Sequence, residues 1–128
     1  DVIYNLLDNA APAVLQTVQE KGIYAVGNIT DQLDVAPKAV LTSAVQDVGG
    51  AIAYIANLVK NNQVKGETYI LGIENPEITK LGRLNDILPE KVKQTIEETQ
   101  QKMLDGELQF EDCSEGGQEK VCIKESQE

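Results

Sequence analysis

The chain has 128 residues, a length that suits one domain and can bury a single ordinary core. Its 21 Asp and Glu residues outnumber 11 Lys and Arg, and the net charge of −10 repels nucleic acid, so we expect no nucleic-acid partner. The sequence contains no histidine, which removes the usual general base and the commonest zinc ligand. It also lacks a phosphate-binding loop and paired-cysteine metal spacing, so we predict neither an enzyme nor a metal or cofactor site.

The first part of the chain predicts a βαβ unit followed by a third strand. Residues 1–7 form a short apolar run that indicates a buried strand, and residues 11–22 have apolar side chains at helical spacing before a Lys-Gly stop. Residues 23–29 predict a second buried strand, and residues 40–45 a third. Strand, helix and strand in this order imply parallel pairing with a right-handed crossover.

The middle of the chain predicts a helix, a strand and a last helix. An apolar stripe at helical spacing marks the helix at about residues 47–62, and it consists of Val48, Ile52, Ile55 and Val59. Residues 66–73 are expected to form the next strand, and residues 74–88 an irregular connection. Pro89 is expected at the first position of the last helix, which Gly106 closes.

Residues 109–128 differ in composition from residues 1–108 and are expected to be a separate tail. Two short β-like pieces flank a Ser-Glu-Gly-Gly turn, which indicates a hairpin with Cys113 and Cys122 on its two arms. A Cys113–Cys122 disulfide would favour an exported protein, and two free thiols are the alternative.

The string GNITDQ ends the second predicted strand in a row of short polar side chains. Ligands bind at the carboxyl ends of parallel strands in open α/β sheets, so these side chains are candidates for the lip of a pocket. The candidate ligand-binding residues are Asn28, Thr30, Asp31, Gln32, Gln46, Asp8 and Asn9. Their alternative roles are structural, because Asp31 and Gln32 would equally cap the loop, and Asp8 and Asn9 would equally cap a helix.

Four strings occur in a fixed order along the chain, namely DVIYNLLDNAAPAVLQTVQEKGIYAVGNITDQ, APKAVLTSAVQD, YILGIENPEITKLGRL and LPEKVKQTIEETQQKMLDGEL. Together they resemble the basic membrane protein family of bacterial purine-nucleoside-binding lipoproteins. Members are substrate-binding components of ABC transporters with the type I periplasmic-binding-protein fold. The resemblance implies an α/β three-layer sandwich with a mainly parallel sheet, and it covers only the carboxyl-terminal portion of such a protein. The amino-terminal lobe is then missing, and the stripe on the helix at about 47–62 would be exposed or covered by a second copy of the chain, giving a homodimer.

The chain departs from the family at three pocket positions. Ile29 stands where the family has an aspartate that grips the ribose hydroxyls, and Gln46 stands where it often has a lysine. Leu7, Asp8 and Asn9 replace small residues after the first strand. A competence-regulator-like branch of the same family shares the first two departures.

The resemblance therefore implies two functions. The first is capture of a nucleoside-like small molecule by closure of two lobes, followed by delivery to a membrane transporter permease. The second is a regulatory or interaction lipoprotein that kept the fold and lost nucleoside binding. Either protein would be extracytoplasmic and anchored to the membrane through a lipoprotein signal in its full-length form.

Overall fold

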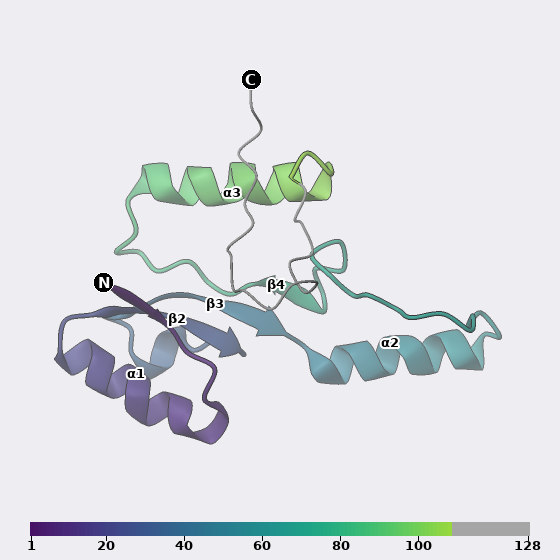
Figure 1. The fold of residues 1–128 in the computed structure, drawn as a ribbon, viewed down its shortest axis with the longest axis horizontal. Helices are drawn as coiled ribbons and strands as arrows, with labels where there is room; N and C mark the ends of the chain where they lie inside the picture. Colours follow the sequence, from purple (N-terminus) through teal and green to yellow (C-terminus); the bar gives the residue numbers. More distant parts are fainter. Residues whose placement is uncertain (109–128) are drawn as a thin grey trace, which may run out of the picture. The chain divides into compact units, whose positions relative to one another are not determined.

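A computed structural model describes residues 1–108, so the predicted hairpin and its two cysteines lie outside the described residues. The chain separates into two compact units, one of residues 1–93 and one that begins at Gln94. The first unit contains the sheet (Figure 1), and the residues that line every pocket discussed below belong to it. Most of the last helix, α3 (Glu90–Leu104), belongs to the second unit; it begins directly after Pro89, and Gly106 follows it with a φ of +73°.

The four strands form one sheet in the order β1-β2-β3-β4. The strands β1 (Val2–Tyr4), β2 (Tyr24–Ile29) and β3 (Val40–Gln46) are parallel neighbours, whereas β4 (Thr79–Leu81) runs antiparallel to β3. The predicted βαβ unit and the mainly parallel α/β sheet are therefore confirmed. Three parallel strands that end at the same edge create the place where a ligand site is expected.

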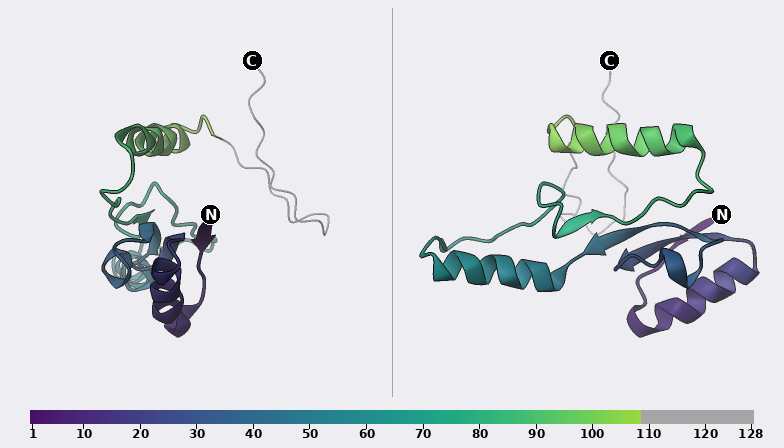
Figure 2. Two further views of the ribbon diagram at one scale, coloured as in Figure 1. Left: turned by 90° about the vertical axis from the view of Figure 1, so that its left-hand side faces the viewer. Right: turned by 180° about the vertical axis from the view of Figure 1, so that it is seen from behind.

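The helix α1 (Ala11–Glu20) lies against one face of the strands (Figure 2) and contributes Leu15 and Val18 to the core. Its first turn contains Pro12, which suits that position because the first amides of a helix have no partner within it. The core is a small cluster between α1, β2, the 3-10 turn η2 (Leu33–Val35) and the start of β3. Its buried members are Leu15, Val18, Ala25, Ala36, Ala39 and Val40.

The prediction that the first strand is buried was wrong. The side chains of β1 are all exposed, with Val2 at 56%. The strand has only three residues and forms an edge of the described sheet, where it pairs with β2 alone. Apolar composition alone does not show whether a strand is central or at an edge.

The prediction of a strand at residues 66–73 was also wrong, because the place beside β3 is taken by β4. Gln46 pairs with Thr79, and the Gly82 amide donates to the Ser43 carbonyl at 2.7 Å. Residues 66–73 form no strand and take no part in this pairing. Ile70, in the middle of that segment, is 82% exposed. The segment predicted to be irregular therefore contributes the fourth strand.

The helix α2 (Val48–Lys60) follows directly from the carboxyl end of β3 (Figure 1). Asp47 caps it, since its carboxylate accepts a hydrogen bond from the Gly50 amide at 2.8 Å. Within this single chain, the stripe residues Val48 and Ile52 are 62% and 67% exposed, whereas Ile55 is half-buried. Whether a second copy of the chain covers the stripe stays a prediction. Within residues 1–108, no helix is both long enough and apolar enough to cross a membrane.

Candidate binding site at the carboxyl edge of the sheet

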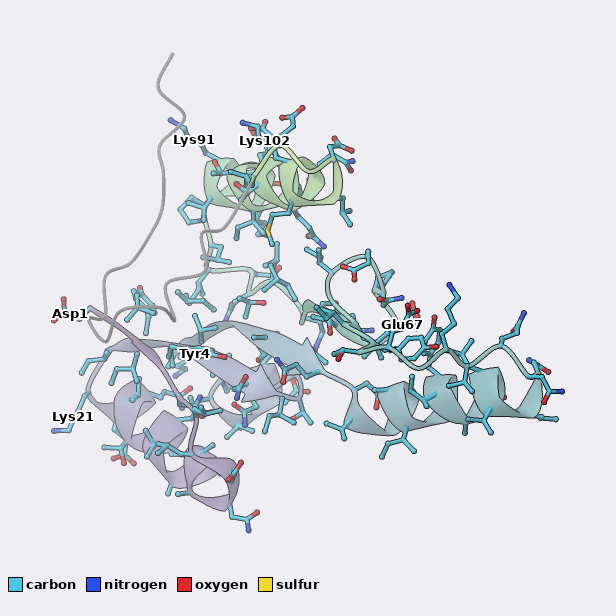
Figure 3. All side chains as sticks on the ribbon, turned by 45° about the vertical axis from the view of Figure 1, so that its right-hand side comes forward. Asp1, Tyr4, Lys21, Glu67, Lys91 and Lys102 are labelled. Carbon is cyan, nitrogen blue, oxygen red and sulfur yellow. The ribbon has the colours of Figure 1, made fainter. Side chains whose placement is uncertain are left out.

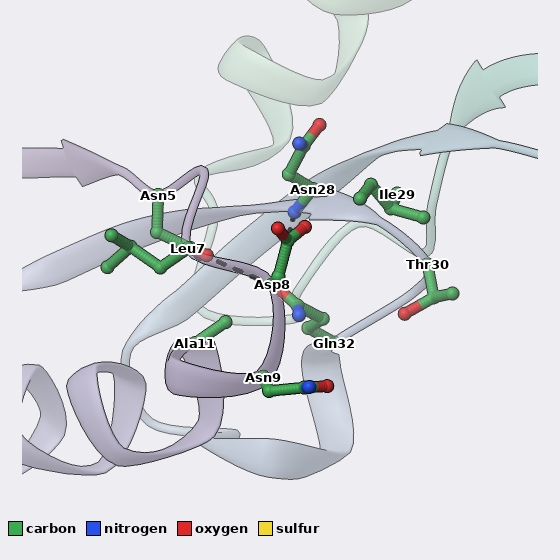
Figure 4. Close-up of a pocket in the computed structure, with 9 residues that line it drawn as sticks. All are labelled: Asn5, Leu7, Asp8, Asn9, Ala11, Asn28, Ile29, Thr30 and Gln32. Atoms are coloured by element: carbon green, nitrogen blue, oxygen red, sulfur yellow. Dashed lines mark hydrogen bonds between the residues drawn. The ribbon is translucent and has the colours of Figure 1, made fainter.

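Two adjacent pockets lie at the carboxyl ends of the parallel strands. The first has a volume of about 250 Å³ and lies between the ends of β1 and β2 and the start of α1 (Figure 4). It is lined by Asn5, Leu7, Asp8, Asn9, Ala11, Asn28, Ile29, Thr30 and Gln32. The second, of about 380 Å³, lies at the ends of β2 and β3 and is lined by Ile29, Thr30, Asp31, Val45, Gln46, Asp47, Val48, Glu77 and Lys80.

The structure brings all seven predicted site residues to these pockets. Those around the first pocket are Asp8, Asn9, Asn28, Thr30 and Gln32, and those around the second are Thr30, Asp31 and Gln46. Thr30 and Ile29 line both pockets and separate them. The residues come from the ends of three parallel segments, which is why positions far apart in the sequence meet at one edge.

Gln32 is held in place by three hydrogen bonds. Its side-chain oxygen accepts from the Asn28 amide at 3.1 Å and from the Asn5 side chain at 3.4 Å (Figure 4). Its own main-chain amide donates to the buried Ser43 hydroxyl at 3.0 Å. Because the oxygen of the carboxamide is occupied, the NH₂ group of Gln32 is left as a hydrogen-bond donor at the first pocket.

Asp31 is held by an arginine that the sequence did not point to. Its carboxylate accepts from the Arg83 side chain at 2.7 Å and from the Arg83 amide at 3.2 Å, and the same guanidinium contacts Asp34 at 2.7 Å. Asp31 also accepts from the Leu33 amide at 3.1 Å. These contacts show the structural alternative, in which Asp31 holds the loop after β2 in place by hydrogen bonds.

The hydrogen bond from the Arg83 side chain is the main reason why the pKa of Asp31 lies below its ordinary value of 3.8. The two carboxylates in turn raise the pKa of Arg83. Asp31 is therefore ionised at neutral pH and already paired, so it does not contribute a free negative charge to the second pocket.

Asn28 is buried, and its side-chain oxygen accepts a hydrogen bond from the Tyr4 hydroxyl at 2.8 Å. Tyr4 is on β1 (Figure 3), so this bond joins the ends of the first two strands. In Figure 4 the Asn28 side chain points away from Asn9 and Gln32. Its remaining NH₂ group is again a donor.

Asp8 and Asn9 do not cap α1, contrary to the alternative left open above. The residue before the helix is Ala10, and no side chain caps it, because Asp8 and Asn9 belong to the 3-10 turn η1 (Asp8–Ala10). Both side chains are exposed at the first pocket, and within residues 1–108 no hydrogen bond or ion pair engages the Asp8 carboxylate. Asp8 therefore supplies the unpaired carboxylate at the first pocket.

The two pockets offer groups that bind a polar molecule. Their polar side chains are carboxamides, the Thr30 hydroxyl, carboxylates and, in the second pocket, the Lys80 ammonium, all of which can form hydrogen bonds to a ligand. In the part of the chain that the structure describes, no group of three acidic residues or thiols is placed to hold a metal ion. The residues that sequence reasoning missed, Tyr4, Asn5 and Arg83, act on predicted site residues that are 24, 27 and 52 positions away.

A mainly parallel sheet with helices and with polar pockets at its carboxyl edge defines one lobe of a type I periplasmic-binding-like fold. The family of PnrA-like ABC transporter substrate-binding proteins has a model that matches residues 1–112. The chain therefore belongs to this family of substrate-binding proteins.

Two relatives carry regulatory names. The chain is 30% identical over 96 residues to the transcriptional activator protein Med of Bacillus subtilis (strain 168), a match that covers 75% of this chain and 30% of that protein. The crystal structure of a transcriptional activator of the comK gene from Bacillus halodurans has the same fold, with a TM-score of 0.76 and 22% identity over 88% of this chain and 39% of that one. The chain thus spans about a third of the length of these relatives. Both relatives belong to the competence-regulator-like branch, which Ile29 and Gln46 had indicated.

Proposed function

We propose that the chain forms one lobe of a solute-binding protein that captures a nucleoside-like small molecule at the carboxyl edge of its sheet. The observation that carries the proposal is the first pocket, whose lining includes the unpaired Asp8 carboxylate and the carboxamides of Gln32 and Asn28. A carboxylate that accepts and NH₂ groups that donate suit a heterocycle whose edge offers both kinds of partner. Membership of a substrate-binding family supports the same conclusion.

The site is completed by a second lobe. Ligand pockets usually have volumes of about 300 to 1,000 Å³, so a pocket of about 250 Å³ on this lobe accounts for only part of a ligand's surface. Closure of the two lobes would then bury the ligand, as in hinged binding proteins. The protein would act outside the cytoplasm, anchored as a lipoprotein, and pass its ligand to a membrane permease.

The test is a calorimetric titration of nucleosides into the longest form of the protein that contains these residues. Gln32→Leu removes the NH₂ donor, and Asp8→Asn removes the unpaired carboxylate, so each should weaken binding about 10-fold or more. Thr17→Ala is a matched control, because Thr17 is an exposed residue of α1 whose hydroxyl bonds within its own helix. Equal affinities in all four proteins would contradict the proposal.

A regulatory role is the second candidate, and the relative named as a transcriptional activator favours it. With a net charge of −10, this chain would act through another protein rather than by contact with DNA. The pocket would then control that contact through its ligand. A gel-shift assay in which the purified protein binds duplex DNA at physiological salt would contradict this form of the second candidate.

A further inference from the structure

Asp8 is the charged residue of the first pocket, and the other residues that line it are apolar or carry amide or hydroxyl groups. In Figure 4 the Asp8 carboxylate points into the middle of these residues. The main chain holds it there, because the Ala10 amide donates to the Leu7 carbonyl at 2.9 Å and closes the turn η1 around Asp8. The first pocket therefore presents one negative charge at a defined place.

Within residues 1–108, no cation of the chain is paired with this charge. Arg83 is already bound by Asp31 and Asp34, each at 2.7 Å. The Lys80 ammonium lines the second pocket, where carboxylates outnumber it. The chain as a whole has a net charge of −10, so its overall field adds to the negative potential at Asp8 and does not cancel it.

The amino end of α1 does not account for the Asp8 carboxylate either. A carboxylate near a helix N-terminus is stabilised when it accepts hydrogen bonds from the amides that are free there. The cap position of α1 is occupied by Ala10, and no side-chain hydrogen bond caps the helix. Pro12, in the first turn, also removes one of these amides. Capping of α1 is therefore not the role of Asp8.

Closure of a second lobe makes an unpaired carboxylate at this place unfavourable. Asp8 is exposed on this lobe, where water solvates its charge. A lobe that closes over the first pocket removes part of that water, and a buried carboxylate is strongly destabilising unless a cation pairs with it. Because the carboxylate points into the pocket, the molecule that fills the pocket is the nearest source of that cation.

We infer that the first pocket selects a nucleoside-like ligand that carries a positive charge, such as a protonated amine or a cationic base, and discriminates against phosphorylated ligands. A hydrogen bond from a cation to a carboxylate is about twice as strong as one between neutral groups. A phosphate would instead bring a like charge toward Asp8, which opposes binding. This inference rests on the proposed function, because it assigns the ligand class of the same site.

The test is a set of calorimetric titrations at about pH 7 with the longest form of the protein that contains these residues. The probes are neutral adenosine, the cations 5′-amino-5′-deoxyadenosine and 1-methyladenosine, and the anion adenosine 5′-monophosphate. The proteins are the wild type, Asp8→Asn and Glu20→Gln. Asparagine keeps the size of the side chain and also tolerates the φ of +43° at position 8, so the fold is kept. Glu20→Gln removes the same charge from the exposed far end of α1 and is the matched control.

The wild type and Glu20→Gln should bind at least one cationic probe about 10-fold tighter than adenosine, and the monophosphate about 10-fold weaker. Asp8→Asn should bring all these affinities to within about 3-fold of one another. Cationic probes that bind the wild type no tighter than adenosine would overturn the inference and leave the proposed function standing. Ratios that are the same in Asp8→Asn as in the wild type would also overturn it, because the partner of Asp8 would then not be the ligand. Binding of no probe by any of the three proteins would overturn both.

Discussion

At the scale of the residue, Gly27 shows why the site needs its local sequence. A Cβ atom at position 27 would overlap the Ser43 hydroxyl and lie 2.8 Å from the Gln32 side-chain oxygen. Both atoms are committed, because the Gln32 amide donates to Ser43 and the Asn28 amide donates to Gln32. The glycine is therefore required by the close approach of two strands and a loop, and not by a turn.

Gly27→Ala should destabilise the fold by about 1 to 3 kcal/mol, because overpacking forces the Gln32 loop or β3 to move. Chemical denaturation measures the loss. Gly66→Ala is the matched control, since a Cβ there meets no atom within 4 Å, and it should change the stability by less than about 1 kcal/mol. Equal stabilities of the two variants would show that the approach at Gly27 is not tight.

The Asp31–Arg83 pair predicts a pH-dependent contribution to stability. Because the pKa of Asp31 is lowered in the folded state, its contribution is present above the ordinary value of 3.8 and is lost as the pH falls through the folded value. Arg83→Gln should therefore lower the urea midpoint at about pH 7 and lower it by less at about pH 2.5. Lys38→Gln is the control, because it removes an exposed charge from the loop that contains Asp31. A deficit of Arg83→Gln that is the same at both pH values would contradict this account.

At the scale of the element, buried side-chain hydrogen bonds decide where the segments of the sheet begin and end. The Asn85 side chain is buried and donates to the Pro37 and Val40 carbonyls at 2.7 and 2.6 Å. Its oxygen accepts from the Ile87 amide at 3.1 Å. One carboxamide thus ties the segment after β4 to the start of β3, which holds the antiparallel strand in place.

Asn85→Ala should destabilise the chain by about 2 to 4 kcal/mol, since it leaves two buried carbonyls without these donors. Asn57→Ala on the exposed surface of α2 should be neutral or slightly stabilising, because alanine has the higher helix propensity. Thermal or urea unfolding of the two variants measures the difference. A loss at Asn85 no greater than that at Asn57 would contradict the role given to this side chain.

The elements that could be predicted from the sequence are those whose signals are local. Apolar residues at helical spacing from Ala11 to Val18 and from Val48 to Val59 define α1 and α2, and the apolar run before Asn28 defines β2. The identity of the fourth strand could not be predicted, since β4 has only three residues and is placed by pairing with β3. The residues that line the pockets could be predicted, because they follow the ends of predicted strands. The pairing of Asp31 with Arg83 could not, because it depends on how distant segments fold together.

At the scale of the whole molecule, α2 presents an apolar surface that the rest of the first unit, residues 1–93, leaves open. The helix has no buried residue, and its only charged side chain is Lys60. A groove of about 510 Å³ runs along it and is lined by Val48, Ala51, Ile52, Ile55, Ala56, Tyr69 and Leu71. Exposed apolar surfaces of this kind are typical of interfaces.

We expect the chain to self-associate through α2 when nothing else covers it. Ile52→Lys should shift the sedimentation behaviour of the chain toward a monomer, because a desolvated charge at the interface opposes association. Gln16→Lys on the exposed side of α1 adds the same charge elsewhere and should leave association unchanged. A wild-type chain that is a monomer over a wide range of concentrations would contradict this expectation.

The central claim is that the edge formed by the ends of β1, β2 and β3 binds a nucleoside-like molecule. The most direct measurement is a thermal-shift screen of purine and pyrimidine nucleosides, with their deoxy and dideoxy forms, against the longest form of the protein that contains these residues. We predict that at least one of these nucleosides raises the melting temperature progressively with its concentration, and that Gln32→Leu makes the shift smaller at every concentration. A well-folded protein whose melting temperature no nucleoside changes would contradict it.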